Sequence, residues 1–306
     1  MEYLFALAGL VLLYFGGEWL VRGAIGISHK LGLPAFLISL TIVGFGTSMP
    51  ELLVSLKAAA SGYPGIVLGN VVGSNIANIL LIIGLAAFIA PIQVSRDMSG
   101  RDSTIMVISA IVLVGALAFE TITPLAGGGM LVALLAYLIV AYMQGRKEGC
   151  SDSDQQALRL STARITILLA AGLAMLVAGA DLLVRGATVI ASDLGVSNAI
   201  IGLTVVAVGT SLPELATSVV AALHRRSDIA IGNVIGSNIF NILGILGITS
   251  LVCPVTVAER FALIDGWVML GATVLLFGLL LFSRQIGRLA GGGFLLAYAA
   301  YVVSMA

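Results

Sequence analysis

Charged side chains are scarce in this chain of 306 residues. It has only 15 basic and 15 acidic residues, 10% of the total, whereas 59% of its residues are hydrophobic. Soluble domains carry roughly 25% charged residues, so the composition excludes a soluble globular protein. The formal net charge of zero also provides no basic surface for nucleic acid.

Cysteine and strict polar alternation are also missing. The two cysteines, Cys150 and Cys253, form neither a disulfide framework nor a zinc motif. Apolar and polar residues do not alternate strictly, which excludes an outer-membrane β-barrel. Long apolar runs are abundant instead, and each is close to the ~20 residues of a helix that crosses a bilayer. The sequence therefore predicts an all-α polytopic membrane protein.

Apolar windows between charged or Pro/Gly-rich segments predict ten transmembrane helices. They lie near 3–22, 35–60, 66–90, 104–119, 124–143, 163–183, 197–223, 229–252, 262–282 and 287–304. The first run follows Met1-Glu2-Tyr3, without the basic region of a signal peptide, so we expect it to be a retained span. The predicted organisation is a first five-helix repeat at 1–143, a cytoplasmic linker at 144–162 and a second five-helix repeat at 163–306.

An internal repeat at an offset of 163 residues supports this division. Between 41–84 and 204–247, 24 of 44 positions are identical without a gap. The motif Gly-Thr-Ser-x-Pro-Glu-Leu begins at Gly46 and at Gly209, and Gly-Asn-Val-x-Gly-Ser-Asn-Ile begins at Gly69 and at Gly232. The two halves of the chain therefore arose by duplication.

An odd number of spans in each half predicts that the halves have opposite orientation in the membrane, as in many secondary transporters. Placing both termini outside puts twelve basic residues on the cytoplasmic side and leaves Lys57, Arg185 and Arg260 outside. Cytoplasmic loops carry the excess of Lys and Arg. The sequence thus predicts two inverted-topology five-helix repeats with extracytoplasmic termini.

Two glutamates, Glu51 and Glu214, lie deep within apolar spans at equivalent positions of the repeat. A charged side chain at the bilayer centre costs ~2.5 to 3.5 kcal/mol, and no basic residue lies in the middle of any span. We therefore expect a bound cation or a proton to compensate the two carboxylates.

Polar residues at helical spacing accompany both glutamates. Thr47, Ser48 and Ser55 share a helix face with Glu51, and Thr210, Ser211 and Ser218 share one with Glu214. The following spans carry Asn70, Ser74 and Asn78, repeated as Asn233, Ser237 and Asn241. Pro50 and Pro213 are expected to free backbone carbonyls near Gly46 and Gly209. Such hard oxygen ligands suit Ca²⁺ or Na⁺.

Packing is the alternative interpretation of many of these residues. Ser, Thr and Asn in membrane helices often join helices by hydrogen bonds, and Gly69 with Gly73, or Gly232 with Gly236, matches small-xxx-small contacts. The pairs Glu18–Arg22 and Asp181–Arg185 have the i, i+4 spacing of interfacial ion pairs. The paired mid-membrane glutamates are what favours an ion site.

The doubled Gly-Thr-Ser-x-Pro-Glu and Gly-Ser-Asn segments strongly resemble the α-repeats of the cation/calcium exchanger superfamily, in particular its prokaryotic Na⁺/Ca²⁺ exchanger-like members. The resemblance covers the whole chain. It implies cations bound between the second, third, seventh and eighth helices, and first and sixth helices that slide against this core to alternate access.

Carried over to this sequence, the resemblance implies Glu51 and Glu214 as ligands shared by Ca²⁺ and Na⁺. The other implied positions are the oxygens of Thr47 and Thr210, sodium ligands Ser48, Ser211, Ser74 and Ser237, central residues Asn78 and Asn241, and the backbone carbonyls of Gly44 and Ala207. The potassium-dependent branch has an aspartate where this chain has Asn241, which argues against potassium co-transport.

The predicted function is a secondary active, electrogenic Na⁺/Ca²⁺ antiporter in a prokaryotic inner membrane. Exchange of H⁺ for Ca²⁺, or for another divalent cation, on the same scaffold stays open, because a glutamate can carry a proton. Saturating, counter-ion-dependent flux would separate an exchanger from a passive channel. An intramembrane enzyme is disfavoured by the absence of a catalytic motif. The expected partners are Ca²⁺, Na⁺ and the lipid bilayer, with no cofactor and no obligate protein partner.

Overall fold

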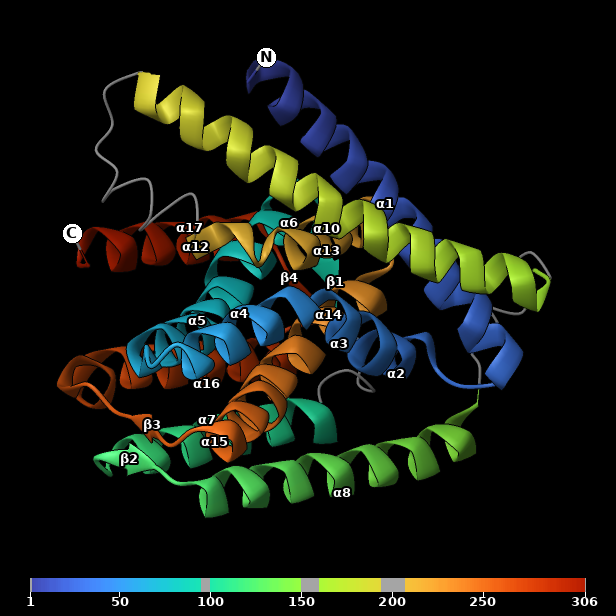
Figure 1. The fold of residues 1–306 in the computed structure, drawn as a ribbon. Coiled ribbons are helices and arrows are strands. Elements are labelled where there is room, and N and C mark those ends of the chain that lie inside the picture. Colours follow the sequence, from blue (N-terminus) through green and yellow to red (C-terminus); the bar gives the residue numbers. More distant parts are fainter. Residues whose placement is uncertain (1, 95–99, 150–159, 194–206, 306) are drawn as a thin grey trace.

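A computed structural model describes residues 2–94, 100–149, 160–193 and 207–305 (Figure 1). The described chain is helical, apart from four strands of two residues each. Several helices continue into short π-helical segments, which carry η labels. The first half comprises α1 (Glu2–Leu31), α2 (Ala35–Ile38), η1 (Ser39–Val43), α3 (Gly44–Thr47), α4 (Met49–Ala60), α5 (Pro64–Ile76), η2 (Ala77–Ile83), α6 (Gly84–Ile89), β1 (Ile92–Gln93), α7 (Arg101–Leu117), β2 (Thr121–Ile122) and α8 (Pro124–Glu148).

The described part of the second half has a similar order, with one additional π-helical segment, η5. It comprises α10 (Thr162–Asp193), α12 (Ala207–Gly209), α13 (Leu212–Leu223), α14 (Ser227–Ile239), η4 (Phe240–Leu246), α15 (Gly247–Val252), β3 (Val255–Thr256), η5 (Phe261–Asp265), α16 (Gly266–Phe282), β4 (Gln285–Ile286) and α17 (Arg288–Val303). The continuous rod 227–252 lies at the centre of the bundle, and its most apolar stretch is entirely buried.

Among the described residues, six helices are long and apolar enough to cross a membrane, and seven if α2–α3 and α4, bent by 42°, form one span. The predicted spans at 104–119 and 287–304 correspond to α7 and α17, which have 17 and 16 residues. Helices of this length rise only about 24–26 Å, less than the ~30 Å hydrocarbon core. The predicted span 197–223 begins outside the described residues.

The two longest helices, α1 and α10, cross each other outside the remaining bundle (Figure 1). Their backbones touch at glycines: a Cβ added to Gly9 would lie 2.7 Å from the carbonyl oxygen of Gly179, and one added to Gly16 would lie 2.9 Å from that of Gly172. Gly9 is equivalent to Gly172 in the repeat, and Gly16 to Gly179. Each contact therefore has its counterpart at the offset of 163 residues.

The four short strands join the two halves of the chain. β1 pairs antiparallel with β4, and β2 pairs antiparallel with β3. By the repeat offset β1 corresponds to β3 and β2 to β4, so the two ladders are equivalent. These strands are the one departure from the predicted all-α fold among the described residues. They lie in the connections before and after α7 and before and after η5–α16.

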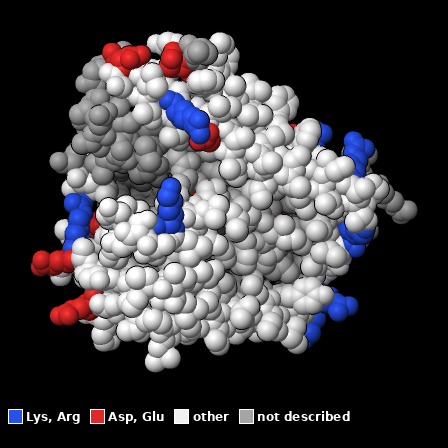
Figure 2. All heavy atoms as spheres, in the orientation of Figure 1, with Lys and Arg blue, Asp and Glu red and all other residues white. Residues whose placement is uncertain are grey.

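Charged side chains lie mainly near the edges of the visible face (Figure 2). The central and lower parts of this face are white, without a gathering of either sign. Large apolar side chains such as Leu125, Phe282 and Leu289 are 87%, 88% and 95% exposed. An uncharged face and exposed leucine and phenylalanine side chains are typical of a protein surface that a bilayer covers.

The two predicted i, i+4 ion pairs are present but differ in their surroundings. Glu18 contacts Arg22 at 2.6 Å and also His224 at the end of α13, and the Glu18 side chain is 11% exposed. In the equivalent pair, Asp181 contacts Arg185 at 2.9 Å and is 53% exposed. Only the first pair therefore links α1 to the helix that carries Glu214.

We expect Glu18→Gln to lower the free energy of unfolding by about 1–3 kcal/mol, since it removes a charged, buried hydrogen-bond partner. The equivalent Asp181→Asn should change it by less than about 1 kcal/mol, as is usual for exposed pairs. Thermal unfolding in detergent measures both. Equal loss in the two variants would contradict the difference in burial.

Candidate functional site

The two glutamates predicted from the sequence occupy equivalent places in the structure. Glu51 lies in the first turn of α4 and Glu214 in the first turn of α13. Each is only 1% exposed. Carboxylates at helix N-termini are favoured by the helix dipole and by the free backbone N–H groups there. The fold thus holds two acidic groups in its interior at helix ends that tolerate negative charge.

The prolines beside the glutamates act differently from the sequence prediction. Pro50 and Pro213 lie in the first turns of α4 and α13 rather than inside continuous helices. Proline is favoured at this position because the first N–H groups of a helix have no intrahelical partner. The helix therefore breaks at Ser48, and the segments 35–47 and 49–60 are bent by 42° relative to each other. The sequence prediction was instead a single span with a carbonyl freed inside it.

Each glutamate accepts a hydrogen bond from a serine of the other half of the chain. Ser48 Oγ donates to Glu214 Oε1 at 2.8 Å, and Ser211 Oγ donates to Glu51 Oε1 at 3.4 Å. The two serines are equivalent in the repeat. The halves thus exchange contacts at one point, and all four side chains are at least 98% buried.

Two asparagines hold the helices that bear the glutamates. Asn70 Nδ2 donates to the backbone carbonyl of Glu51 and to Ser55 Oγ, both at 2.8 Å. Asn233 Nδ2 makes the same pair of bonds to the Glu214 carbonyl at 3.3 Å and to Ser218 Oγ at 3.0 Å. The spacing of both asparagines indicated this face, but not that they bind backbone beside the glutamates.

Three predicted positions meet at the break between α3 and α4. The carbonyl of Gly44 accepts from Ser237 Oγ at 3.2 Å and from Thr47 Oγ1 at 3.3 Å. Thr47 Oγ1 also lies 3.3 Å from Asn233 Oδ1. Ala207, the counterpart of Gly44, begins α12, which contacts α5.

Asn78 and Asn241 occupy π-helical segments, η2 and η4 respectively. Such segments are rare and are frequent at functional sites. Asn78 Nδ2 donates to Asn238 Oδ1 at 2.9 Å. By the repeat, Asn241 and Asn75 are equivalent to Asn78 and Asn238, but the corresponding bond is absent: Asn241 Nδ2 has no partner within the described chain. Asn75 Nδ2 donates to the carbonyl of Val71 in its own helix.

Several buried polar atoms at this place have no hydrogen-bond partner within the described chain. They are Glu51 Oε2, Glu214 Oε2, Asn78 Oδ1, and both Oδ1 and Nδ2 of Asn241. Buried polar groups are nearly always paired, and an unpaired one indicates a ligand, water or ion. All but one of these atoms are oxygens, the atoms that bind Ca²⁺ and Na⁺.

The remaining predicted positions, Ser74 and Thr210, line a cavity of about 470 Å³. Asn70 lines it as well, together with Arg260, Asp265 and Tyr301. The cavity thus runs from residues beside the glutamates toward η5 and α17. The structure joins predicted residues of the two halves through the contacts Ser48–Glu214, Ser211–Glu51 and Ser237–Gly44.

Neither Glu51 nor Glu214 takes part in an ion pair with any described Lys, Arg or His. Two carboxylates without a basic partner in a medium of low dielectric constant favour binding of positive charge. Hydroxyl, amide and carbonyl oxygens surround them. The chemistry available at this place is therefore coordination of a hard cation, or protonation of a carboxylate.

Comparisons with known proteins agree with the motifs. A model of the sodium/calcium exchanger protein family matches residues 1–143 and 164–306. The chain is 36% identical to the sodium/calcium exchanger MaX1 of Methanosarcina acetivorans, over 99% of this chain and 98% of that protein. It is 33% identical to the inner membrane protein YrbG of Escherichia coli, over 94% and 93%. A structure of the sodium-calcium exchanger NCX_Mj soaked with Na⁺ and Sr²⁺ matches with a TM-score of 0.86 and 33% identity, over 100% and 98% of the two chains.

Proposed function

The chain belongs to the sodium/calcium exchanger protein family, and we propose that it is a secondary active antiporter that exchanges Na⁺ for Ca²⁺. Its relatives MaX1 and NCX_Mj are both named sodium/calcium exchangers. In this proposal the two cations are substrates, the protein is not an enzyme, and no cofactor takes part. The site lies within a multi-pass membrane protein.

The observation that carries the proposal is the pair of buried glutamates with unpartnered oxygens, Glu51 Oε2 and Glu214 Oε2. Two ionised glutamates hold a charge of minus two, which one Ca²⁺ neutralises. Sodium ions must balance the same charge collectively. Calcium and sodium therefore compete for the two carboxylates, and this competition couples their movements.

The other ligands in this proposal are those at which the two halves meet. Thr47, Thr210 and the carbonyls of Gly44 and Ala207 complete the coordination around the glutamates. Ser48 and Ser211, with Ser74 and Ser237, form sodium sites on either side of the centre, which Asn78 and Asn241 line. Three hydrogen bonds support this placement of the serines: Ser48 to Glu214, Ser211 to Glu51, and Ser237 to the Gly44 carbonyl.

We propose further that ten spans form two inverted five-helix repeats, joined by the cytoplasmic segment 144–162, with both termini outside. The equivalent ladders β1–β4 and β2–β3 support a two-fold relation between the halves. So do the exchanged serine–glutamate bonds. The glycine contacts between α1 and α10 hold these two helices against each other, so that in this proposal they move as one unit against the core.

Exchange of H⁺ for Ca²⁺ is the second candidate. It is favoured by the burial of both carboxylates without a basic partner among the described residues, because a proton also neutralises a buried carboxylate and needs no cage of oxygens. In this case protonation of the glutamates would replace sodium binding during the return step.

The test is uptake of ⁴⁵Ca²⁺ into proteoliposomes loaded with Na⁺, with K⁺, or with a pH gradient alone. Sodium exchange predicts uptake only with internal Na⁺. If three Na⁺ leave for each Ca²⁺ that enters, one net positive charge leaves the vesicle. An inside-positive potential then adds ~2.3 kcal/mol per 100 mV to the driving force for uptake, so uptake should be faster.

Uptake with the pH gradient alone would replace sodium by protons as the coupling ion. Uptake that is equal in all three kinds of vesicle, and that does not saturate with Ca²⁺, would overturn the antiporter proposal. Vesicles without protein provide the leak rate that is subtracted from each.

A further inference from the structure

Helices α7 and α8 follow each other in the chain, but each packs mainly against another helix. α7 packs against α16, and α8 packs against α15 and η4. The space between α7 and α8 is a groove with a volume of about 940 Å³, here called the α7–α8 groove. Known small-molecule sites have volumes of about 300–1,000 Å³ and mainly apolar walls. The groove is thus large enough for a ligand.

The walls of the groove are mainly apolar, and α8 contributes a row of small side chains beside the larger Met130, Tyr137 and Val140. α8 contributes Ala126, Gly129, Ala133 and Ala136, which share one helix face. α7 contributes Ile105, Ile108 and Val112 at the spacing of one face. Ile108 and Val112 are 48% and 43% exposed, so the groove opens sideways, toward the surface that a bilayer covers. Buried Leu243 of η4 also lines it, and lies two residues from Asn241.

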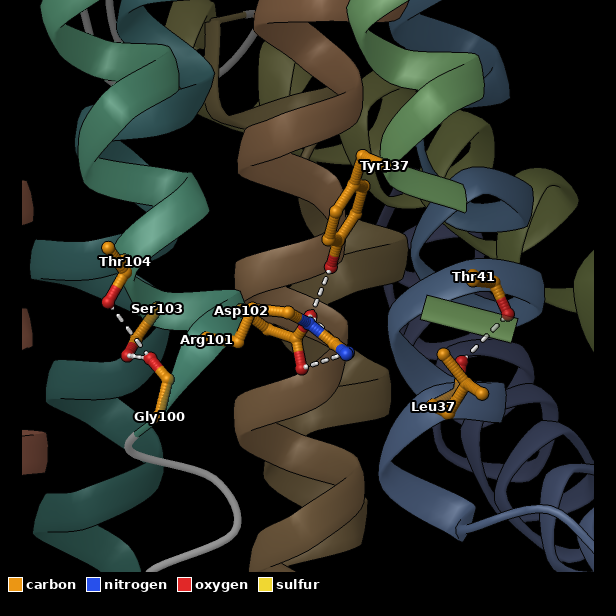
Figure 3. A network of polar contacts seen from close by, with 8 residues as sticks. All are labelled: Leu37, Thr41, Gly100, Arg101, Asp102, Ser103, Thr104 and Tyr137. Carbon is orange, nitrogen blue, oxygen red and sulfur yellow. Dashed lines mark hydrogen bonds and ion pairs between the residues drawn. The ribbon is translucent and has the colours of Figure 1, made fainter. Parts of the chain in front are cut away.

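One end of the groove is polar (Figure 3). Arg101 and Tyr137 line this end, and Asp102 lies between them in the first turn of α7. Tyr137 Oη donates to Asp102 Oδ1 at 2.9 Å, and Arg101 donates to the same carboxylate through Nε at 3.1 Å and Nη2 at 3.0 Å. Within the described contacts, Arg101 Nη1 keeps its donors for another acceptor.

The dimensions of the groove match those of a lipid. From Arg101 to Leu117, α7 rises about 24 Å, less than the ~30 Å hydrocarbon thickness. A single acyl chain spans about half of that thickness, so it fits within the length of α7. Arginine forms directed hydrogen bonds with phosphate oxygens.

We propose that the α7–α8 groove binds one phospholipid, with an acyl chain along the small side chains of α8 and its phosphate hydrogen-bonded to Arg101. Asp102 and Tyr137 position the guanidinium at the headgroup end. This site is separate from the glutamates, and its test does not depend on ion exchange.

The experiment is native mass spectrometry of the full chain, released from detergent after stepwise removal of lipid. Wild-type protein should retain one phospholipid per chain. Ala133→Phe and Ala136→Phe fill the groove and should lower that occupancy at least about tenfold, because the added rings clash with the acyl chain. Val132→Phe is the matched control: Val132 is 67% exposed on α8 and does not line the groove, so its occupancy should stay at the wild-type level.

The headgroup is tested by adding back dioleoylphosphatidylglycerol or dioleoylglycerol, which differ in the phosphate-containing headgroup. Wild-type protein should prefer the phospholipid by about tenfold, and Arg101→Gln should lose this preference, since a charge-assisted bond to phosphate is absent. Wild-type occupancy in both filled variants would overturn the proposal. Equal binding of the two added lipids by wild-type protein would overturn the role of Arg101, which remains testable if a filled variant fails to fold.

Discussion

Glu51→Gln and Glu214→Gln should each abolish Ca²⁺ exchange, with a loss of about 100-fold or more in transport efficiency. Removing one partner of a buried ion pair, here a carboxylate that binds the cation, costs about 3–5 kcal/mol. A factor of ten in affinity corresponds to about 1.4 kcal/mol. Glutamine keeps the shape and the bond from Ser48 or Ser211 but removes one negative charge. The readout is sodium-driven ⁴⁵Ca²⁺ uptake into proteoliposomes at several Ca²⁺ concentrations.

Glu259→Gln is the control for the loss of one negative charge, since Glu259 is exposed near the start of η5. It should exchange at the wild-type rate. The thermal midpoint of every variant in detergent separates lost transport from lost folding. Full transport by either Glu51→Gln or Glu214→Gln would exclude that glutamate as a shared ligand.

The second large effect is expected at Gly236, where Gly236→Ala should prevent accumulation of folded protein. A Cβ at this position would lie 1.9 Å from the carbonyl oxygen of Leu40 in η1, and real Cβ contacts this short do not occur. The neighbour is backbone within a buried helix crossing, so it cannot turn away as a side chain would. Relief would require separation of α14 from η1, with loss of the packing between them.

The repeat provides the matched control, because Gly73 is equivalent to Gly236. No described atom lies within 4 Å of a Cβ added to Gly73. Gly73→Ala should therefore fold, with a free energy of unfolding within about 1 kcal/mol of the wild-type value. Size-exclusion chromatography and thermal unfolding of the two variants measure the difference. Equal folding of both would contradict the close contact between α14 and η1.

The sequence prediction of packing at the two glycine pairs was thus correct for one pair in particular. Gly232 and Gly236 pack against backbone of α2 and η1, with Cβ distances of 2.7 and 1.9 Å to carbonyl oxygens. Gly69 has only the ring of Phe261 nearby, at 3.8 Å. Identical motifs in the two halves therefore meet different surroundings, and a sequence repeat does not reveal which copy is tightly packed.

The break at Ser48 shows a related limit. Hydropathy predicts one continuous span at 35–60, because apolar composition is unaffected by a single bend. Pro50 could lie inside a kinked helix or in the first turn of a new one, and both agree with the sequence. The structure has the second arrangement, which places Glu51 in the first turn of α4.

The amino-acid sequence by itself determined the membrane class, the family, the repeat and the positions of Glu51 and Glu214. Hydropathy, motif spacing and internal identity are properties of the linear chain, so these conclusions need no coordinates. Only the tertiary structure decided that Ser48 bonds to Glu214 and Ser211 to Glu51, that Gly236 but not Gly73 touches described backbone, and that α7 and α8 leave a groove. These contacts join residues far apart in the chain, and their partners are fixed by helix packing, on which local sequence periodicity carries no information.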